Sequence, residues 1–271
     1  MTGVRFEKWT ALGNDYLIVE RDQLPFALTP ARVQRLCDPH FGPGGDGVLE
    51  LAPPSQAGYV ASLRIFNPDG SEAELSGNGA REAIMYLRRH GWTAADTFSI
   101  ETKAGEIRPT ITGPTTCQVD MGRATPPVAG EIDGFRYLAL QIGNPQCTIH
   151  VAHPDELEAL DLPAIGPSIE HGEAFPNRTN VSFWTVLAPD RIRARIFERG
   201  VGETLSSGTG ASGAAVAHVS RGGDSPVTVI LDGGELVVDV GEDLHVDLTG
   251  WAVPIYAGKC SPELIDTLRA L

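Results

Sequence analysis

The sequence predicts an α+β fold with two structurally similar halves, in which a mostly antiparallel sheet wraps round a central helix in each half. Three observations lead to this fold class. A block of the sequence recurs in the second half of the chain, strand-like segments greatly outnumber helical ones, and each half has one helix behind a Gly-rich turn.

The internal repeat appears when the sequence is compared with itself at a shift of 131 positions. Nine of the twenty positions from 64 to 83 are then identical, without a gap. At a shift of 130, Gly13-Asn14 also aligns with Gly143-Asn144. The matching pairs in the longer block are Arg64-Ile65-Phe66 with Arg195-Ile196-Phe197, Glu72 with Glu203, Ser76-Gly77-x-Gly79-Ala80 with Ser207-Gly208-x-Gly210-Ala211, and Ala83 with Ala214.

Alternating apolar and polar residues predict most of the strands. The segments concerned are 59–66, 98–102, 116–121, 180–186, 191–197, 227–231 and 236–240. Helices are predicted over 79–89 and 210–221, and Gly91 and Gly222 stand where C-terminal stops belong. The second helix is so rich in Ala and Gly that it must pack very closely against its surroundings.

A Gly/Pro-rich stretch at 122–128 predicts the change from one half to the other. Residues 251–256 read as a strand that crosses back to the first half. The predicted domains are therefore 1–121 together with 255–271, and 122–254.

The formal net charge of −14 argues against a nucleic-acid or anionic-membrane binder, since both need basic surface. No apolar run approaches the roughly 18–20 residues of a membrane span, and the first residues carry no apolar signal core. We expect a cytoplasmic protein.

A metal site is not expected. The four cysteines form no C-x-x-C pair. A strand end running into a Pro-containing turn explains His150-x-x-His153-x-Asp155 as well as a ligand set does.

The two Gly-rich helix starts predict one anion site shared between them. Their glycines leave backbone N–H groups uncovered where a helix begins, and these groups together with the helix dipole favour an anion such as a carboxylate. The plainer alternative is that Ser76 and Ser207 only cap their helices. The dinucleotide fingerprint Gly208-x-Gly210-x-x-Gly213 is disfavoured, because the first block has Glu82 at the third glycine and the preceding strand ends near Phe197. The G-x-S-x-G elbow of serine hydrolases is absent.

At these residues the sequence resembles the diaminopimelate epimerase family along nearly its whole length. The segments that carry the resemblance are 12–16 (LGNDY), 44–47 (GGDG), 66–71 (FNPDGS), 77–81 (GNGAR), 143–145 (GNP), 179–181 (TNV) and 197–204 (FERGVGET). Their order and spacing are highly specific.

The resemblance implies an isomerase without cofactor or metal that inverts one α-carbon of an amino diacid and converts L,L- into meso-diaminopimelate for lysine and peptidoglycan biosynthesis. It implies a small-molecule partner, and leaves homodimerisation open. Two groups act as acid and base on opposite faces of the carbon. The resemblance places the α-carboxylate on the backbone of Gly77, Asn78, Gly208 and Thr209. It places the far end of the substrate on Asn14, Asn67, Asn144, Asn180, Glu198 and Arg199.

The sequence departs from the family at the reacting groups. Both catalytic cysteine positions hold serine, Ser76 and Ser207, and the histidine that tunes a thiol is Gln146. A glutamine that contacts substrate is Gly47. Glu198, beside Arg199, is a second residue able to tune a catalytic group; a strand-end salt bridge between the two is the alternative. A serine hydroxyl is a far weaker acid than a thiol, and becomes a base only when a neighbour accepts its proton.

Three functions stay open at this point: an epimerase or racemase working with serines, a related dehydratase or isomerase that needs one base, and a binding protein with little activity. In each case Ser76 and Ser207 are predicted to face one another across a cleft lined by Asn67, Asn180 and Arg199.

Overall fold

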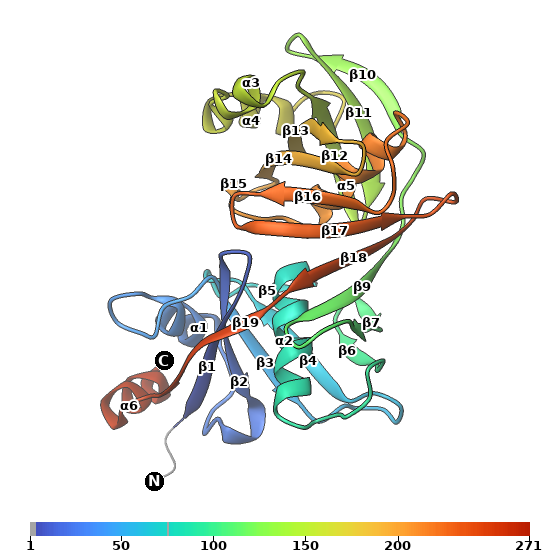
Figure 1. Ribbon diagram of the computed structural model, residues 1–271. Helices are drawn as coiled ribbons and strands as arrows, with labels where there is room; N and C mark the ends of the chain where they lie inside the picture. The colour runs from blue at the N-terminus through green and yellow to red at the C-terminus, as the bar shows by residue number, and fades with distance from the viewer. Residues whose placement is uncertain (1–3, 75) are drawn as a thin grey trace. The chain divides into compact units, whose positions relative to one another are not determined.

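The computed structural model describes residues 4–74 and 76–271 (Figure 1). The chain divides into two compact units, one built from the residues up to Val119 together with Trp251–Leu271, the other from Asp120–Gly250. Strand β9 (Thr116–Arg123) continues from one unit into the next. No helix in the described part of the chain is long and apolar enough to cross a membrane.

The first unit contains a sheet in the order β19-β1-β2-β3-β4-β6-β7, with β5 paired to β4. The short strand β8 pairs with β9. The elements are β1 (Arg5–Ala11), β2 (Asn14–Glu20), η1 (Arg21–Gln23), α1 (Pro30–Cys37), β3 (Val48–Ala52), β4 (Ala61–Phe66), β5 (Glu72–Ala73), α2 (Gly77–Arg89), β6 (Ile100–Thr102), β7 (Gly105–Ile107), β8 (Thr110–Ile111), β19 (Val253–Lys259) and α6 (Pro262–Ala270).

The second unit contains strands in the order β10-β11-β12-β13-β14-β16-β17-β18, with β15 paired to β14. The elements are β10 (Val128–Ile132), β11 (Phe135–Ile142), β12 (Asn144–His150), α3 (Pro154–Glu158), α4 (Leu162–Glu170), β13 (Asn180–Ala188), β14 (Arg191–Glu198), β15 (Gly202–Thr204), α5 (Gly208–Val219), β16 (Val227–Leu231), β17 (Gly234–Val240) and β18 (His245–Trp251).

The two units repeat one topology, which confirms the repeat and the fold class predicted from the sequence. In the first unit β2 pairs with β3, and β4 with β6, in parallel; β12 with β13 and β14 with β16 do the same in the second. The other pairs are mostly antiparallel. The register also repeats: Ile65 lies opposite Ala73, and Ile196 opposite Thr204, as a shift of 131 requires.

Each unit has a central helix that is buried on nearly all sides, as predicted for the second one. Ten consecutive residues of α2, Asn78–Leu87, are buried, and so are Gly210–His218 of α5. In α5 the close approach depends on glycine, because a Cβ at Gly210 lies 2.8 Å from the Ile196 side chain. The predicted helix starts at 79 and 210 were two residues late, since the helices begin at Gly77 and Gly208.

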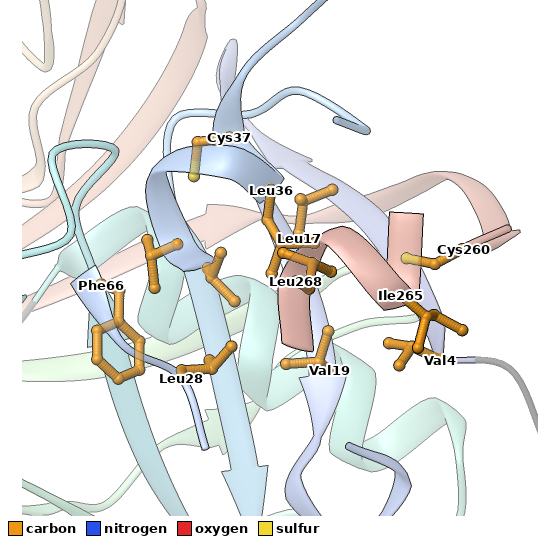
Figure 2. Packing of buried hydrophobic residues seen from close by; sticks show 12 residues of the cluster. Val4, Leu17, Val19, Leu28, Leu36, Cys37, Phe66, Cys260, Ile265 and Leu268 are labelled. Atoms are coloured by element: carbon orange, nitrogen blue, oxygen red, sulfur yellow. The ribbon is translucent and has the colours of Figure 1, made fainter. Parts of the chain in front are cut away.

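The other face of each sheet is covered by the remaining helices. Figure 2 shows Leu36 of α1 and Leu268 of α6 packed near Leu17 and Val19 of β2. In the second unit α3 and α4 pack against Cys147 and Ile149 of β12 in the same way. Since side chains alternate along a strand, Tyr16 of β2 and Gln146 of β12 point to the opposite face, toward the central helix.

Strand ends near the unit boundaries differ in detail from the sequence prediction. β18 ends at Trp251 and β19 begins at Val253, so the predicted strand over 251–256 is two strands separated by Ala252. The strand predicted to end near Phe197 is followed by the short strand β15, antiparallel to β14. β15 was missed because three residues are too few to show a period of two.

Candidate active site

The two helix starts have nearly the same local structure. Ser76 (φ −132°, ψ 121°) and Ser207 (φ −141°, ψ 120°) are extended residues directly before α2 and α5. The Ser76 Oγ accepts a hydrogen bond from the Gly79 N–H at 3.1 Å, and the Ser207 Oγ accepts one from the Gly210 N–H at 3.2 Å. Both serines are therefore N-caps, at the positive end of a helix dipole that favours a bound anion.

An ion pair behind each helix start repeats as well. Arg64 contacts Glu72 with Nη2–Oε2 at 2.9 Å, and Arg195 contacts Glu203 with Nη2–Oε1 at 2.6 Å. In each unit the ion pair joins a long strand, β4 or β14, to the short strand, β5 or β15, that precedes the serine. The strands before the two serines are thus joined in the same way.

In the second unit a partly buried carboxyl group lies near Ser207. The Thr204 hydroxyl donates to Glu198 Oε1 at 2.9 Å. Desolvation raises the pKa of Glu198 above its ordinary value, and the Thr204 and Ser207 hydroxyls beside the carboxyl lower it by less. Glu198 is therefore a carboxylate of raised basicity within reach of Ser207.

The strand-end salt bridge between Glu198 and Arg199, which the sequence left as an alternative, is not formed in the described part of the chain. The Arg199 guanidinium donates to the Asn177 carbonyl at 3.1 Å and is exposed. The Arg199 backbone N–H donates to Asn180 Oδ1 at 2.8 Å, while Asn180 Nδ2 donates to the Thr209 hydroxyl at 3.2 Å. Asn180 is 2% exposed. Its amide therefore ties the end of β14 to the start of α5.

Gln146 lies along α5 beyond the helix start. Its Nε2 donates to Asn144 Oδ1, and a Cβ built on Gly213 lies 3.0 Å from its Cγ. Gln146 is 1% exposed, and its Oε1 has no hydrogen-bond partner among the described residues. The tuning role predicted for this position is not visible as a hydrogen bond to Ser207 within the described residues.

In the first unit the predicted substrate-binding amides belong to two loops. Asn14 Nδ2 donates to Asp46 Oδ2 at 2.9 Å, in a loop where the Asp46 N–H also donates to the Asp15 carbonyl. Asn67 Nδ2 donates to the Ser71 hydroxyl at 2.9 Å. At the start of α2, Asn78 Oδ1 accepts from Arg81 at 2.5 Å. The described residues show no hydrogen bond from Asn14 or Asn67 to Ser76.

Tyr16 is a site residue that the sequence analysis missed. Its hydroxyl donates to Ser76 Oγ at 3.2 Å, and the side chain is 5% exposed. Its ring fills the space beside Gly47, where a Cβ lies 2.5 Å from Tyr16 Cε1 and also overlaps the Phe66 carbonyl oxygen. The shift of 130 that aligns Asn14 with Asn144 aligns Tyr16 with Gln146, so the repeat contained a signal for this position.

The described residues include one cluster with the side chains to hold a metal ion, away from the helix starts. Asp120 of β9 and His245 and Asp247 of β18 have their ligand atoms within 4.8 Å of one another. His245 Nε2 lies 3.2 Å from Asp120 Oδ1. An ordinary ion pair explains this arrangement. His150, part of the cluster considered in the sequence, contacts the Trp184 ring edge-on, with 4.7 Å between the ring centroids.

Comparison with known proteins decides the family. The family model described as diaminopimelate epimerase matches residues 6–126 and 138–253. A protein named diaminopimelate epimerase 2 from a Nostoc species is 38% identical over 280 residues, which cover 96% of this chain and 97% of the relative. A diaminopimelate epimerase from Pelotomaculum thermopropionicum is 38% identical over 94% of this chain and 98% of its own length. The chain belongs to the diaminopimelate epimerase family.

Solved structures show that the fold extends beyond this family. A PhzF-family phenazine biosynthesis protein from Bacillus anthracis matches with a TM-score of 0.74 at 19% identity, over 96% of this chain and 100% of its own. A structure described as a probable proline racemase from Agrobacterium radiobacter matches with a TM-score of 0.68 at 15% identity, over 97% and 95%. At these identities the likeness concerns the fold alone.

The sequence analysis predicted that the two serines stand at the acid/base positions of this family. The structure brings Ser207, Glu198, Asn180, Thr209 and the backbone of Arg199 together in the second unit. In the first unit it brings Tyr16 to Ser76 and leaves Asn14 and Asn67 in separate loops. That Ser76 and Ser207 face one another across a cleft stays a prediction.

Proposed function

We propose that the protein epimerises diaminopimelate at one α-carbon, from the L,L to the meso isomer, without a cofactor and with serines at the two reacting positions. Family membership over nearly the whole chain supports the substrate. The single observation that supports the chemistry is the place of the Glu198 carboxyl beside Ser207, whose hydroxyl lowers the Glu198 pKa.

This contact answers the main objection to serine in the reaction. A serine acts as a base only when a neighbouring group accepts its proton. When Ser207 Oγ takes the α-proton, its own proton passes to Glu198, so no free alkoxide forms. The partly buried carboxyl, with its raised pKa, is better matched to the task than an exposed glutamate.

The helix starts supply the remaining stabilisation in this proposal. Removing an α-proton moves negative charge onto the adjacent carboxylate. The backbone of Gly77, Asn78, Gly208 and Thr209 is proposed to bind that carboxylate at the positive ends of α2 and α5. Exposed Arg199 is proposed to bind the distal carboxylate of the substrate. Asn180 then acts indirectly, because it holds the Arg199 backbone and the Thr209 hydroxyl.

The test is exchange of the α-hydrogen in heavy water. The native protein is incubated with L,L- or meso-diaminopimelate, and deuterium incorporation and stereochemistry are both followed. Glu198→Gln removes the proton acceptor, so both rates are expected to fall by about 10²–10⁴-fold. Glu242→Gln, which changes an exposed carboxyl in the turn between β17 and β18, is the control and is expected to keep both rates.

The pH profile gives a second readout. Glu198 must be ionised to accept a proton, so the native rate is expected to rise with pH through its raised pKa. The rise therefore lies above the range of an ordinary glutamate, near 4.3, and is absent from Glu198→Gln. A native protein that exchanges no α-hydrogen in either isomer would overturn the proposed function.

A reaction that needs one base is the second candidate, and the asymmetry of the site favours it. In the described residues a carboxyl group contacts Ser207 but not Ser76. A dehydratase or isomerase removes the α-proton and completes the reaction without returning a proton to the opposite face. It is recognised in the same incubation by a new product in place of the second isomer.

We further propose that the protein works in the cytoplasm. The four cysteines, Cys37, Cys117, Cys147 and Cys260, are buried and unpaired, as is usual in a reducing compartment. Homodimerisation is open, and light scattering of the purified protein measures it directly.

A further inference from the structure

Both serine hydroxyls accept the N-cap hydrogen bond of their helix, but they differ in their second polar neighbour. A hydroxyl group donates one hydrogen bond and accepts two. Ser76 Oγ accepts from the Gly79 N–H at 3.1 Å and from the Tyr16 hydroxyl at 3.2 Å. Both acceptor positions are filled from within the protein, so the Ser76 proton is the part of the group left to face a ligand.

Ser207 has the complementary arrangement. Its Oγ accepts from the Gly210 N–H at 3.2 Å, and the Glu198 carboxyl beside it is a group that can take its proton. One acceptor position of the oxygen is left to face a ligand. The hydroxyl of Ser76 is thus arranged to give a proton, and that of Ser207 to take one.

We infer that Tyr16 is a positioning residue that makes Ser76 the acid of the reaction and relays a proton to it. The inference rests on the proposed function and assigns a direction to it. Ser207 takes the α-proton while passing its own to Glu198, and Ser76 protonates the opposite face of the carbanion while taking the proton of the Tyr16 hydroxyl.

The protons balance in this scheme. One C–H bond breaks at the Ser207 face and one forms at the Ser76 face. Glu198 ends protonated and Tyr16 ends as a phenolate, and exchange with water after product release restores both. The negative charge rests on a phenol, which ordinarily titrates near 10, rather than on an aliphatic alkoxide. A phenol is therefore the kind of neighbour that a serine needs in order to act as an acid.

The packing round Tyr16 is specific to this task. The ring reaches Ser76 because position 47 is glycine, since a side chain there would overlap Tyr16 Cε1 and Cδ1. A Cβ on Gly79 would lie 3.4 Å from Tyr16 Cε2, so the ring is held between β3 and the start of α2. In the second unit Gln146 has the equivalent place and its amide turns to Asn144 instead. A side chain at position 47 and the present place of the Tyr16 ring therefore exclude one another.

Tyr16→Phe tests the inference, because it deletes the hydroxyl and keeps the ring. Inversion is expected to fall by about 10²-fold. Deuterium exchange into the isomer whose α-proton Ser207 removes is expected to stay close to the native rate, because Ser207 and Glu198 still remove and return that proton on one face. Exchange without inversion is the signature of a missing acid, and a loss of folding alone does not produce it.

Two further variants keep the test decisive. Tyr86→Phe deletes another largely buried hydroxyl of the same unit, bonded to Glu20 Oε1 at 2.8 Å, and is expected to keep the native ratio of exchange to inversion. Ser76→Ala is expected to give the same signature as Tyr16→Phe, and the double variant no further loss, because Tyr16 acts through Ser76.

The outcomes separate the inference from the function on which it rests. If the native protein epimerises and Tyr16→Phe keeps inversion, or loses inversion and exchange by the same factor, the relay is wrong and the proposed function stands. If the two losses add in the double variant, Tyr16 acts independently of Ser76 and the relay is also wrong. If the native protein exchanges neither isomer, the proposed function fails and the relay with it.

Discussion

The start of α2 and the start of α5 share the features of a repeated fold but differ in the side chains beside the serine. The strand order, the Arg–Glu pair, the serine cap and the glycine that it bonds are the same in both. The neighbours of the serine hydroxyl differ: a phenol at Ser76 and a carboxyl group at Ser207. Each unit provides a similar helix end, and the different neighbours give the two serine hydroxyls different chemical environments.

One turn further along α2 and α5 the two helices differ more than they do at their starts. Glu82 is a fully buried glutamate one turn into α2, whereas the matching position in α5 is Gly213, which leaves room for Gln146. At this position of the central helix the first unit therefore has a titratable group, and the second unit has none. Changes at the two serines are therefore expected to affect activity, and changes deeper in the two helices are expected to affect stability.

The largest effect is expected from replacing both serines by cysteine. Ser76→Cys with Ser207→Cys restores the thiols of the family on a scaffold that already provides the helix starts. Thiols near pKa 8.5 are far stronger acids than hydroxyl groups, so epimerase activity is expected to rise by about 10²–10⁴-fold if diaminopimelate is the substrate. Adding Gln146→His is expected to raise it further. Correctly folded variants that gain nothing would exclude this substrate.

Iodoacetamide supplies the control for the thiol variants. Burial raises the pKa of Cys37, Cys117 and Cys147 to about 12, and raises that of Cys260 as well. The native protein is therefore expected to resist alkylation, while the double variant is inactivated and protected by substrate. Rapid inactivation of the native protein would show that one of its own cysteines is functional.

The features that the two units share could be predicted from the sequence, because they depend on backbone pattern. The repeat, the two helices and their serine caps follow from residue identity and spacing. The partners of the serines do not. A salt bridge between Glu198 and Arg199 was one alternative from the sequence, but the carboxyl accepts from the Thr204 hydroxyl and lies beside Ser207, while the Arg199 guanidinium donates to the Asn177 carbonyl.

Tyr16 escaped prediction for a related reason. Its reach to Ser76 depends on the empty space at Gly47, which is visible only when β2 and β3 are paired. The hairpin before it was also obscure, because Leu12 adopts a positive φ of 55° ahead of Gly13, where sequence signals favour Asn, Asp or Gly. Short-range patterns locate elements, whereas side-chain partners depend on tertiary pairing.

A smaller effect is expected at Glu82. Burial raises its pKa well above the ordinary value, against the opposing effects of the Arg81 charge and the Tyr16 N–H. The folded state therefore holds this proton more tightly than the unfolded state. The stability it contributes is full at low pH and is lost as pH rises through the folded pKa.

Glu82→Gln removes that titration. Its free energy of unfolding is expected to exceed that of the native protein by about 1–3 kcal/mol at the alkaline end of a pH series, and by less toward acid pH. Denaturant unfolding across the series measures both curves. Glu74→Gln, at an exposed residue, is expected to follow the native curve, and parallel curves for Glu82→Gln would show that the buried carboxyl does not control the pH dependence.

The smallest effect concerns the serines as caps, and it separates the two ends by pH. Ser76→Ala and Ser207→Ala each lose one N-cap hydrogen bond of similar length, so each is expected to lower stability by about 0.5–2 kcal/mol at acid pH. Ser261→Ala, which removes the cap of α6 bonded to the Leu264 N–H at 3.2 Å, is the matched control away from the site.

Ser207 also lowers the pKa of Glu198, so the loss of its hydroxyl raises that pKa further. The Ser207→Ala deficit is therefore expected to grow as pH rises, while the Ser76→Ala and Ser261→Ala deficits stay constant. Equal pH dependence in all three variants would show that the Ser207 proton is not held by Glu198, and would remove the asymmetry on which both the base and the acid assignments depend.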